Sequence, residues 1–273
     1  MSITCNITVF NDWPTLQRSL DCIAAQDMLP SQVLVADDGS EDSLGIALAN
    51  WANARGIAVT HVWHPNKGFR KCELLNMAAT QTTGDFILYI DHDCLVRRNF
   101  VRSHAAFARE DMIHVGPRIH VMPPSSARFR PTHSGIAKAV LRRNLVGCLS
   151  AVHGAKVQST PPKLIEGCNM MVPTRAIREI NSYDNRYRSK GYGVDADLVV
   201  RGWFAGYKMG ISGFSTTVYH LWHPSSAPQD NRALFDDMVA RKVARCDDGL
   251  SVHMSVTPAR TKHGSYERVV FSD

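Results

Sequence analysis

Two aspartates close a strongly apolar run in the sequence. In "FILYIDHDCLV" (86–96), Asp91 and Asp93 follow a strand-like segment, and side chains two residues apart in an extended backbone point to the same side. Two carboxylates in that position suit Mg²⁺ or Mn²⁺, and such an ion could hold a diphosphate. His92 would then point away from both acids. The alternative is a solvated polar turn.

Two further acidic segments offer related chemistry. Asp38 lies in the turn "ADDGSEDS", where its carboxylate could accept hydrogen bonds from a base and a ribose hydroxyl or simply belong to an Asp-Gly turn. Asp195 and Asp197 open a predicted helix that ends at Gly206, and they could act on a substrate or only cap that helix. Tyr192, between two glycines, could stack on a sugar face.

Two histidines end another strand-like segment, "TTVYHLWHPSS" (216–226). His220 or His223 could supply a further metal ligand at the end of the strand. A single histidine is more often a hydrogen-bonded core residue, so this segment alone leaves both interpretations open.

The elements that must position these residues alternate regularly. Short β-branched segments at 3–10, 32–36, 57–63 and 86–90 predict strands, and helical spacing of apolar residues predicts helices over 15–25, from Leu44 to Gly56 and over 70–80. This alternation predicts a parallel sheet with right-handed crossovers, in which ligands gather beyond the carboxyl ends of the strands.

The pattern loosens after about residue 120. Proline-rich segments at 122–131 and 159–163 bracket an insertion that we predict to be helical, and a helix over 231–245 and a polar tail are expected at the end. The stretch 127–144 carries five basic residues and no acid. A solvated helix face is its simplest interpretation, while an anionic membrane surface or an acidic substrate is the alternative. No nucleic-acid-binding module accompanies it, so we expect no nucleic-acid partner.

Composition limits the class of protein. The 273 residues are 44% hydrophobic, enough for one large domain or two small ones. Seven cysteines without a CxxC pair indicate a reducing compartment. The beginning of the sequence does not read as a signal peptide, and no apolar run approaches the roughly 18 residues of a membrane span. We therefore expect a cytoplasmic protein.

Seven segments in a fixed order resemble the family-2 glycosyltransferases of the GT-A fold. They extend from residue 3 to about 224 and read "TVFN", "VLVADDGS", "NKGFRKCELLNMA", "GDFILYIDHDC", "EGCNMMV", "INSYDNRYRSKGYGVDADL" and "VYHLWHP". The later ones resemble the branch of chondroitin-type polymerases and animal galactosyl- and N-acetylgalactosaminyltransferases. The resemblance implies one Rossmann-like α/β domain with a mostly parallel sheet. Within it, 1–120 would bind the nucleotide-sugar, 121–163 would be the basic insertion, 164–230 would hold the acceptor and catalytic half, and 231–273 would be the helix and tail.

The resemblance also implies a role for each matching residue. The donor would be bound by Phe10, Asn11, Asp38, Lys67, Arg70 and Asp91, with Asn76 supporting the helix after Arg70. Asp93 and His220 would bind Mn²⁺ or Mg²⁺, with His223 as the alternative ligand. The acceptor would meet Tyr192, Asn169 and Asp197. Asp195 would be the general base, but the family's preceding glutamate is Val194 here, which leaves open whether Asp195 or Asp197 faces the nucleophile.

The activity expected from this resemblance is metal-dependent, inverting transfer of a sugar. The donor would be a nucleotide-sugar such as a UDP-sugar, and the acceptor a hydroxyl of a glycan or lipid-linked saccharide, with peripheral contact to the inner face of the plasma membrane as a possibility for the basic insertion. The alternatives are a retaining transferase of the polypeptide N-acetylgalactosaminyl type, a non-catalytic nucleotide- or glycan-binding domain, and a metal-dependent phosphohydrolase.

Overall fold

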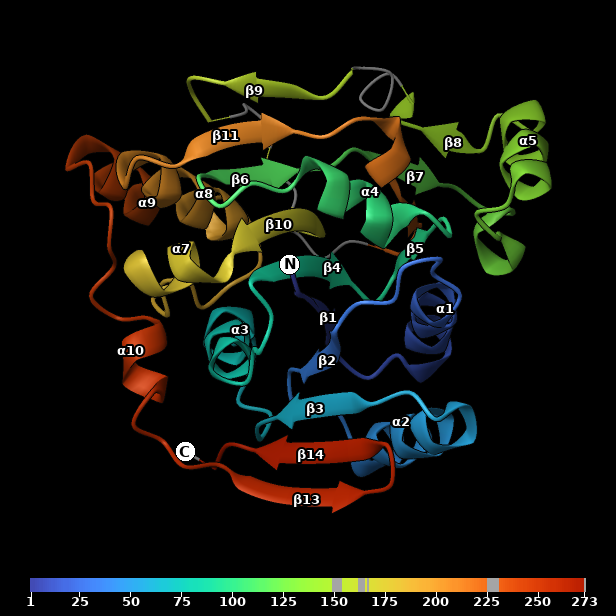
Figure 1. The fold of residues 1–273 in the computed structure, drawn as a ribbon, viewed down its shortest axis with the longest axis horizontal. Coiled ribbons are helices and arrows are strands. Elements are labelled where there is room, and N and C mark those ends of the chain that lie inside the picture. The colour runs from blue at the N-terminus through green and yellow to red at the C-terminus, as the bar shows by residue number, and fades with distance from the viewer. Residues whose placement is uncertain (149–153, 162–164, 166, 225–230, 273) are drawn as a thin grey trace.

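A large twisted sheet forms the centre of the protein. The computed structural model describes residues 1–148, 154–161, 165, 167–224 and 231–272. Within these residues, ten strands lie in the order β13-β14-β3-β2-β1-β4-β10-β6-β11-β9 (Figure 1). The strands are β1 (Ile3–Val9), β2 (Gln32–Asp37), β3 (Val59–Trp63), β4 (Phe86–Asp91), β6 (Met112–Val115), β9 (Lys156–Gln158), β10 (Asn169–Pro173), β11 (Lys208–Ile211), β13 (Ala259–His263) and β14 (Tyr266–Val270).

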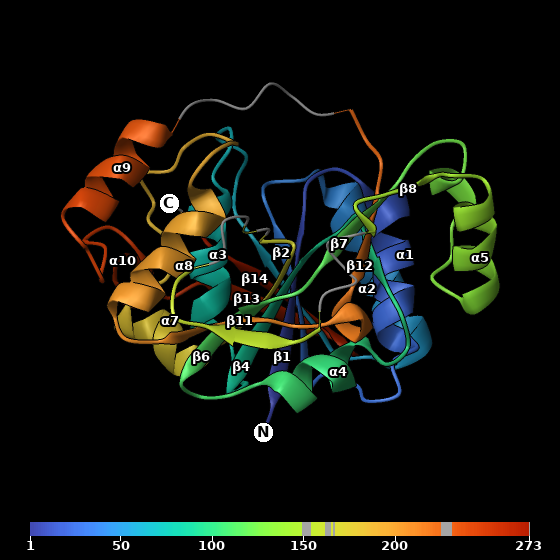
Figure 2. The ribbon, with the colours of Figure 1, turned by 90° about the horizontal axis from the view of Figure 1, so that it is seen from above.

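Helices cover both faces of this sheet (Figures 1 and 2). One face packs against α1 (Trp13–Ala24), α2 (Asp42–Arg55) and α4 (Phe100–Phe107), and the other against α3 (Lys71–Thr80), α7 (Thr174–Glu179) and α8 (Val194–Phe204). Two further helices, α9 (Arg232–Ala240) and α10 (Leu250–His253), lie beside α8 and α3. Among the described residues, no helix combines the length and the apolar character that crossing a bilayer requires.

Local sequence explains where the first helices begin and end. Asp12 caps α1 by accepting a hydrogen bond from the Thr15 backbone N–H, 3.1 Å away, and the helix buries Leu16, Leu20 and Ile23. Helix α2 ends at Gly56, whose φ of 62° lies in the left-handed region that glycine adopts without strain. These elements agree with the predicted alternation of strands and helices.

The parallel strands bring the acidic segments to one edge of the sheet. Strand β1 pairs in parallel with both β2 and β4, so that Thr8 lies opposite Asp91 and Val9 opposite Asp37. Strand β10 runs antiparallel to β4. The expected α/β fold with a parallel sheet core is confirmed, and the carboxyl ends of β1, β2 and β4 share one edge.

A second, smaller sheet places the histidines. It contains β5 (Cys94–Val96), β7 (Arg118–Val121), β8 (Leu145–Val146) and β12 (Val218–Leu221), in the order β5-β12-β7-β8. Antiparallel pairing aligns His220 with Cys94, the residue after Asp93. The basic insertion forms helix α5 (His133–Leu141), which packs on this sheet.

The end of the chain differs from the helix and polar tail expected over 231–273. Helix α9 ends at Ala240, and β13 and β14 form a hairpin that extends the central sheet. Strand β14 pairs in parallel with β3, and the Tyr266 hydroxyl lies 2.7 Å from Nδ1 of buried His61. The sequence of this hairpin resembles that of a polar tail because β13 is an exposed edge strand, and edge strands tolerate polar and charged residues.

Candidate functional site

A cleft of about 570 Å³ opens at the carboxyl edge of the parallel strands. This volume falls in the range typical of small-molecule sites. Of the residues to which the sequence analysis gave a binding or catalytic role, the structure places seven in the wall of this cleft: Phe10, Asp38, Asp91, Asp93, Asp195, His220 and His223. Segments far apart in the chain thus meet at the edge where the sheet topology predicted a ligand site.

At one end of the cleft, Asp38 is held in place by two neighbours. Its Oδ1 lies 2.9 Å from Nε2 of buried His64, and its Oδ2 accepts a hydrogen bond from the Arg70 backbone N–H at 3.3 Å. Phe10 leaves 47% of its surface exposed beside this carboxylate in the cleft wall. An ordered carboxylate and an exposed ring are suited to a base and a ribose. His64 was not noticed in the sequence because it has no motif of its own.

The loop 66–70 forms part of the same wall. Asn66, Gly68 and Phe69 line the cleft, whereas Lys67 and Arg70 do not. The Arg70 guanidinium pairs with Glu73, at 2.6 Å from Nε to Oε2. Asn11 also stays outside the wall: its side chain accepts a hydrogen bond from the Glu41 backbone N–H. Asn76 is buried and donates to the Tyr183 carbonyl at 2.8 Å, so it fixes α3 to that loop.

A lysine that sequence reasoning missed lies beside Asp91. Lys71 Nζ is 3.0 Å from Asp91 Oδ1, and Thr8 donates a second hydrogen bond to the same oxygen. Burial raises the pKa of Asp91, but the Lys71 charge and the hydrogen bonds from Thr8 and Lys71 together outweigh burial and lower that pKa to about 2. Burial alone would lower the pKa of Lys71, but Asp91 and Asp195 raise it above its usual value. Both groups are therefore charged at neutral pH.

A carboxylate and two imidazoles form a compact cluster beside Asp91. The Asp93 Oδ2 atom lies 3.2 Å from His220 Nε2 and 3.1 Å from His223 Nε2, and one ligand atom from each of the three lies within 4.8 Å of the others. The hydrogen bond to Asp93 raises the pKa of His223 to about 9, whereas burial lowers the pKa of His220. The structure thus brings together Asp93 and both alternative histidines.

The donor set of this cluster fits a divalent transition ion. Carboxylate oxygen suits Mg²⁺ and Mn²⁺ alike, but two imidazole nitrogens favour Mn²⁺, because Mg²⁺ prefers oxygen ligands and water. The Nδ1 atom of His220 is buried and has no hydrogen-bond partner among the described residues. No hydrogen bond to Nδ1 therefore holds the ring in the tautomer whose Nε2 can bind the ion. The residues therefore fit Mn²⁺ better than Mg²⁺.

The backbone between the two aspartates is not extended. Strand β4 ends at Asp91, and a turn at His92 and Asp93 precedes β5. The prediction that an extended backbone aligns the two acids and turns His92 away is wrong, because the chain must change direction to enter the smaller sheet. His92 also lines the cleft, with Nε2 3.6 Å from Asp12 Oδ2.

Asp195 enters the cleft from the first turn of α8. The helix follows Gly193, whose φ is 96°, and Asp195 Oδ1 is buried with no hydrogen-bond partner among the described residues. Burial raises the pKa of Asp195, and the charge of Lys71 opposes part of this rise. Gly167 makes room for it, since a Cβ there would lie 2.1 Å from Asp195 Oδ1. Gly167 belongs to the motif "EGC", and only its contact with Asp195 shows why it is glycine.

Asp197 and Asn169 are not in the cleft. In a helix, residues two apart point about 200° apart, and Asp197 faces inward, with Oδ1 2.6 Å from Arg201 Nε. Asn169 is fully buried, with its amide donating to the Pro117 and Thr216 carbonyls at 2.8 Å each. Both side chains thus make internal contacts outside the cleft wall, and their role toward an acceptor stays a prediction.

Tyr192 lies at the rim of the cleft. It is 48% exposed, its ring meets Phe235 edge-on, and the Arg232 guanidinium lies 4.9 Å from the ring centroid. Lys190 and Gly191, just before it, belong to the cleft wall. The ring is accessible to a large ligand, and its role toward an acceptor stays a prediction.

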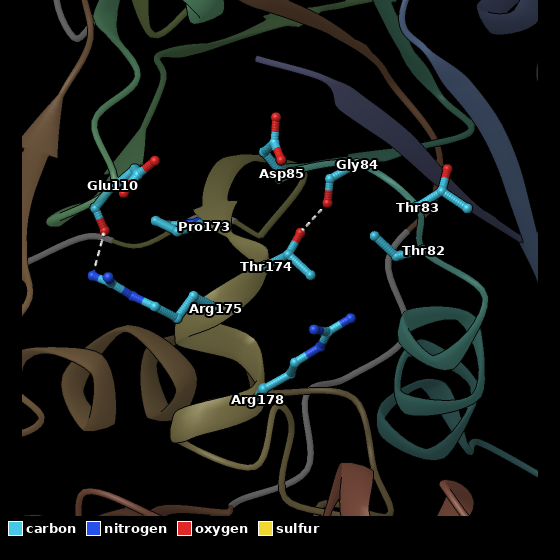
Figure 3. Close-up of a pocket in the computed structure, with 9 residues that line it drawn as sticks. All are labelled: Thr82, Thr83, Gly84, Asp85, Glu110, Pro173, Thr174, Arg175 and Arg178. Carbon is cyan, nitrogen blue, oxygen red and sulfur yellow. Dashed lines mark hydrogen bonds between the residues drawn. The ribbon is translucent and has the colours of Figure 1, made fainter.

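A second pocket, of about 410 Å³, lies at the opposite end of the strands, where β4 begins (Figure 3). It is formed where β4 begins and α7 starts, and the Thr174 hydroxyl there donates to the Gly84 carbonyl at 2.6 Å. Arg175 reaches across it to the Glu110 carbonyl at 3.4 Å. None of the residues singled out in the sequence lines this pocket, so the carboxyl edge is the better site for chemistry.

Comparison with known proteins gives related sequences. A sequence profile described as "Glycosyl transferase family 2" matches residues 4–154. Over 118 residues, 42% of this chain, the sequence is 29% identical to a hyaluronan synthase of Pasteurella multocida and 27% identical to a chondroitin synthase of Pasteurella multocida (strain Pm70). The chain matches only 12% of the length of each of these relatives.

Solved structures share the fold. TarS 1–349 of S. aureus, in complex with UDP-GlcNAc, aligns with a TM-score of 0.65 at 15% identity, over 93% of this chain and 69% of that chain. GalNAc-T7 with UDP, GalNAc and Mn²⁺ aligns with a TM-score of 0.60 at 14% identity, over 85% of this chain and 45% of that chain. These likenesses confirm the expected fold.

Proposed function

The chain belongs to glycosyl transferase family 2, the family that its motifs resemble, and from this premise we propose a metal-dependent, inverting transferase of the GT-A type. The donor would be a nucleotide-sugar, with UDP as its first candidate because both solved neighbours described above carry UDP or a UDP-sugar. The acceptor would be a hydroxyl of a glycan or of a lipid-linked saccharide. Family membership disfavours the phosphohydrolase and the non-catalytic alternatives.

One observation carries the proposal: Asp195 lines the same cleft as the cluster of Asp93, His220 and His223. Among the carboxylates of the cleft wall, Asp38, Asp91 and Asp93 are each engaged by a histidine or a lysine. Among these four carboxylates, only Asp195 has a fully buried oxygen without a hydrogen-bond partner among the described residues, and burial raises its pKa. A general base works best when its pKa approaches the working pH.

The reaction assigns one task to each group. As the acceptor oxygen bonds to the anomeric carbon, Asp195 takes the hydroxyl proton, and the nucleoside diphosphate leaves with the electrons of the broken bond. Asp38 and Phe10 would hold the nucleoside so that the sugar faces Asp195. A divalent ion bound by Asp93, His220 and His223 would offset the charge of the diphosphate.

The arrangement supports inversion rather than retention. Retention by double displacement needs a carboxylate free to attack the anomeric carbon. Asp91, the acid nearest the cluster along the chain, is held by Lys71 and Thr8 in its charged form. A single base with a free oxygen, by contrast, is what one in-line displacement requires, and such a displacement converts an α-linked donor into a β-glycoside.

The test begins with donor binding. Thermal unfolding is followed with UDP- and GDP-sugars, with and without Mn²⁺, and a saturable, Mn²⁺-dependent rise in Tm identifies the donor. The proton NMR coupling of the anomeric centre in the product then reports the linkage. Asp195→Asn should keep the Tm shift and lose transfer. The absence of any donor-dependent shift would overturn the proposal, and an α-linked product would favour the retaining alternative.

A further inference from the structure

The positive charge of the chain is concentrated in one stretch of the sequence, which contains α5. Between Asp111 and Glu166 the sequence contains eight of its 31 lysines and arginines and none of its 25 aspartates and glutamates. The rest of the chain therefore carries 23 basic against 25 acidic residues. The net charge of +6 therefore arises from this one stretch, between Asp111 and Glu166, rather than from the protein as a whole.

Helix α5 is firmly attached on its inner face. Thr132 caps it by accepting a hydrogen bond from the Gly135 backbone N–H, and Ala139 and Ile136 pack with Phe129 against the smaller sheet. Arg18 on α1 donates to the carbonyl of Phe129 at 2.9 Å. The helix stands at the periphery of the molecule in both ribbon views (Figures 1 and 2).

Its outer face is apolar, which is unusual for a surface helix. Ala137, Val140 and Leu141 follow the i, i+3, i+4 spacing of one helical face, yet all three are exposed, Leu141 by 83% and Val140 by 54%. We call these three residues the α5 outer face. The cations beside it are Lys138, Arg142, Arg143, Arg128 and Arg130, all exposed, and none forms an ion pair with a residue that the structure describes.

We propose that the α5 outer face docks onto a bilayer that contains anionic phospholipid. Cations attract anionic headgroups, and exposed apolar side chains insert at the boundary between headgroups and acyl chains. A nucleic acid or an acidic glycan would use the cations but would leave Leu141 and Val140 in water, so a lipid surface accounts for both features. The proposal does not depend on the sugar-transfer activity.

The placement of α5 relates this surface to the cleft. Strand β7, which leads into the insertion, pairs in parallel with β12, so that Val121 lies opposite Leu221. The carboxyl ends of both strands share an edge, and His223 follows β12 at that edge. Docking through α5 would thus hold the cleft edge near the membrane, where an acceptor carried on a lipid would reside.

The experiment is sedimentation of the full chain with vesicles. Vesicles of phosphatidylcholine alone are compared with vesicles that also contain phosphatidylglycerol, whose anionic headgroups attract basic surfaces. We expect binding only to the anionic vesicles, with a bound fraction that falls as NaCl rises. Equal binding to both vesicle types, or no binding, would overturn the proposal.

Matched variants separate the two contributions. Lys138→Gln and Leu141→Ser should each lower the partition coefficient about fivefold. Lys262→Gln on β13 and Leu29→Ser, which also change exposed residues, should leave it unchanged. Leu141→Ser should keep transfer to a soluble acceptor. Equal effects of test and control variants would argue for nonspecific adsorption, and retention on heparin without vesicle binding would identify a polyanion as the partner instead.

Discussion

The ammonium of Lys71 lies 3.0 Å from the carboxylate of Asp91 and also acts electrostatically on Asp195. One cation at the start of α3 therefore acts on two acids of the cleft, one of which we propose as the general base. It keeps Asp91 charged, and it limits how far burial raises the pKa of Asp195. A base that must be deprotonated at neutral pH needs such a neighbour when it is buried.

Removing this charge should change the pH dependence of transfer. The proposed base, Asp195, would work only when deprotonated, so we expect activity to be lost as the pH falls through its pKa. Lys71→Met removes the attraction that holds this pKa down, and the acid limb of the kcat/KM profile should move to higher pH. Lys71→Arg keeps the charge and should leave the limb near its original position. A limb that stays in place in Lys71→Met would show that Lys71 does not tune the base.

The two aspartates of α8 should respond differently to the same substitution. Asp195→Asn should lower kcat about 10²- to 10⁴-fold without changing the urea unfolding midpoint. Asp197→Asn leaves the buried Arg201 guanidinium without its carboxylate, and it should destabilise the fold by about 3–5 kcal/mol. A stable but inactive Asp197→Asn protein would reverse the assignment of the base.

Mn²⁺ binding should depend on pH through His223. The Asp93 hydrogen bond raises the pKa of this imidazole to about 9, and a metal ligand must be unprotonated. Apparent Mn²⁺ affinity, measured by calorimetry in the presence of UDP, should therefore rise between pH 7 and pH 9. His223→Ala should bind more weakly and lose most of this pH dependence. His263→Ala, on the exposed strand β13, provides the control.

Gly167 should prove essential for catalysis without contributing a side chain. In Gly167→Ala, the new Cβ would collide with Asp195 at 2.1 Å, and a displacement of the base by about 1 Å costs on the order of 10²-fold in kcat. Mn²⁺ and UDP binding should persist. Gly154→Ala is the matched control, because nothing lies within 4 Å of its added methyl group. Equal activity in the two variants would contradict the proposed position of Asp195.

The sequence predicted the sheet well because its signals are local. Apolar segments of strand length alternate with helical ones over the first 90 residues, and parallel pairing then places Asp38 and Asp91 at one edge. Only the family resemblance predicted that Asp93 and a histidine of the later segment lie together in one cluster. The pairing of β12 with β5 brings His220 beside Asp93, and residues 127 positions apart carry no local signal of this contact.

The errors also have physical causes. Lys71 was overlooked in favour of Lys67 and Arg70 because the direction of a side chain depends on where α3 begins, which the sequence determines only to within a few residues. Asp197 could have been set aside from helical geometry alone, since it lies about 200° from Asp195. The polar β13–β14 hairpin lacked the alternation that marks a strand, because only β14 has a buried side.

That hairpin imposes an order on folding during synthesis. Tyr266 on β14 meets His61, 205 residues earlier in the chain. At about 5–20 residues per second, a ribosome needs on the order of 10–40 s to deliver this partner. Until then β3 is an open sheet edge that other nascent chains can pair with. The half formed by residues 1–120, although it is synthesised before β14, is therefore expected to finish folding last and to depend on chaperones that shield its edge.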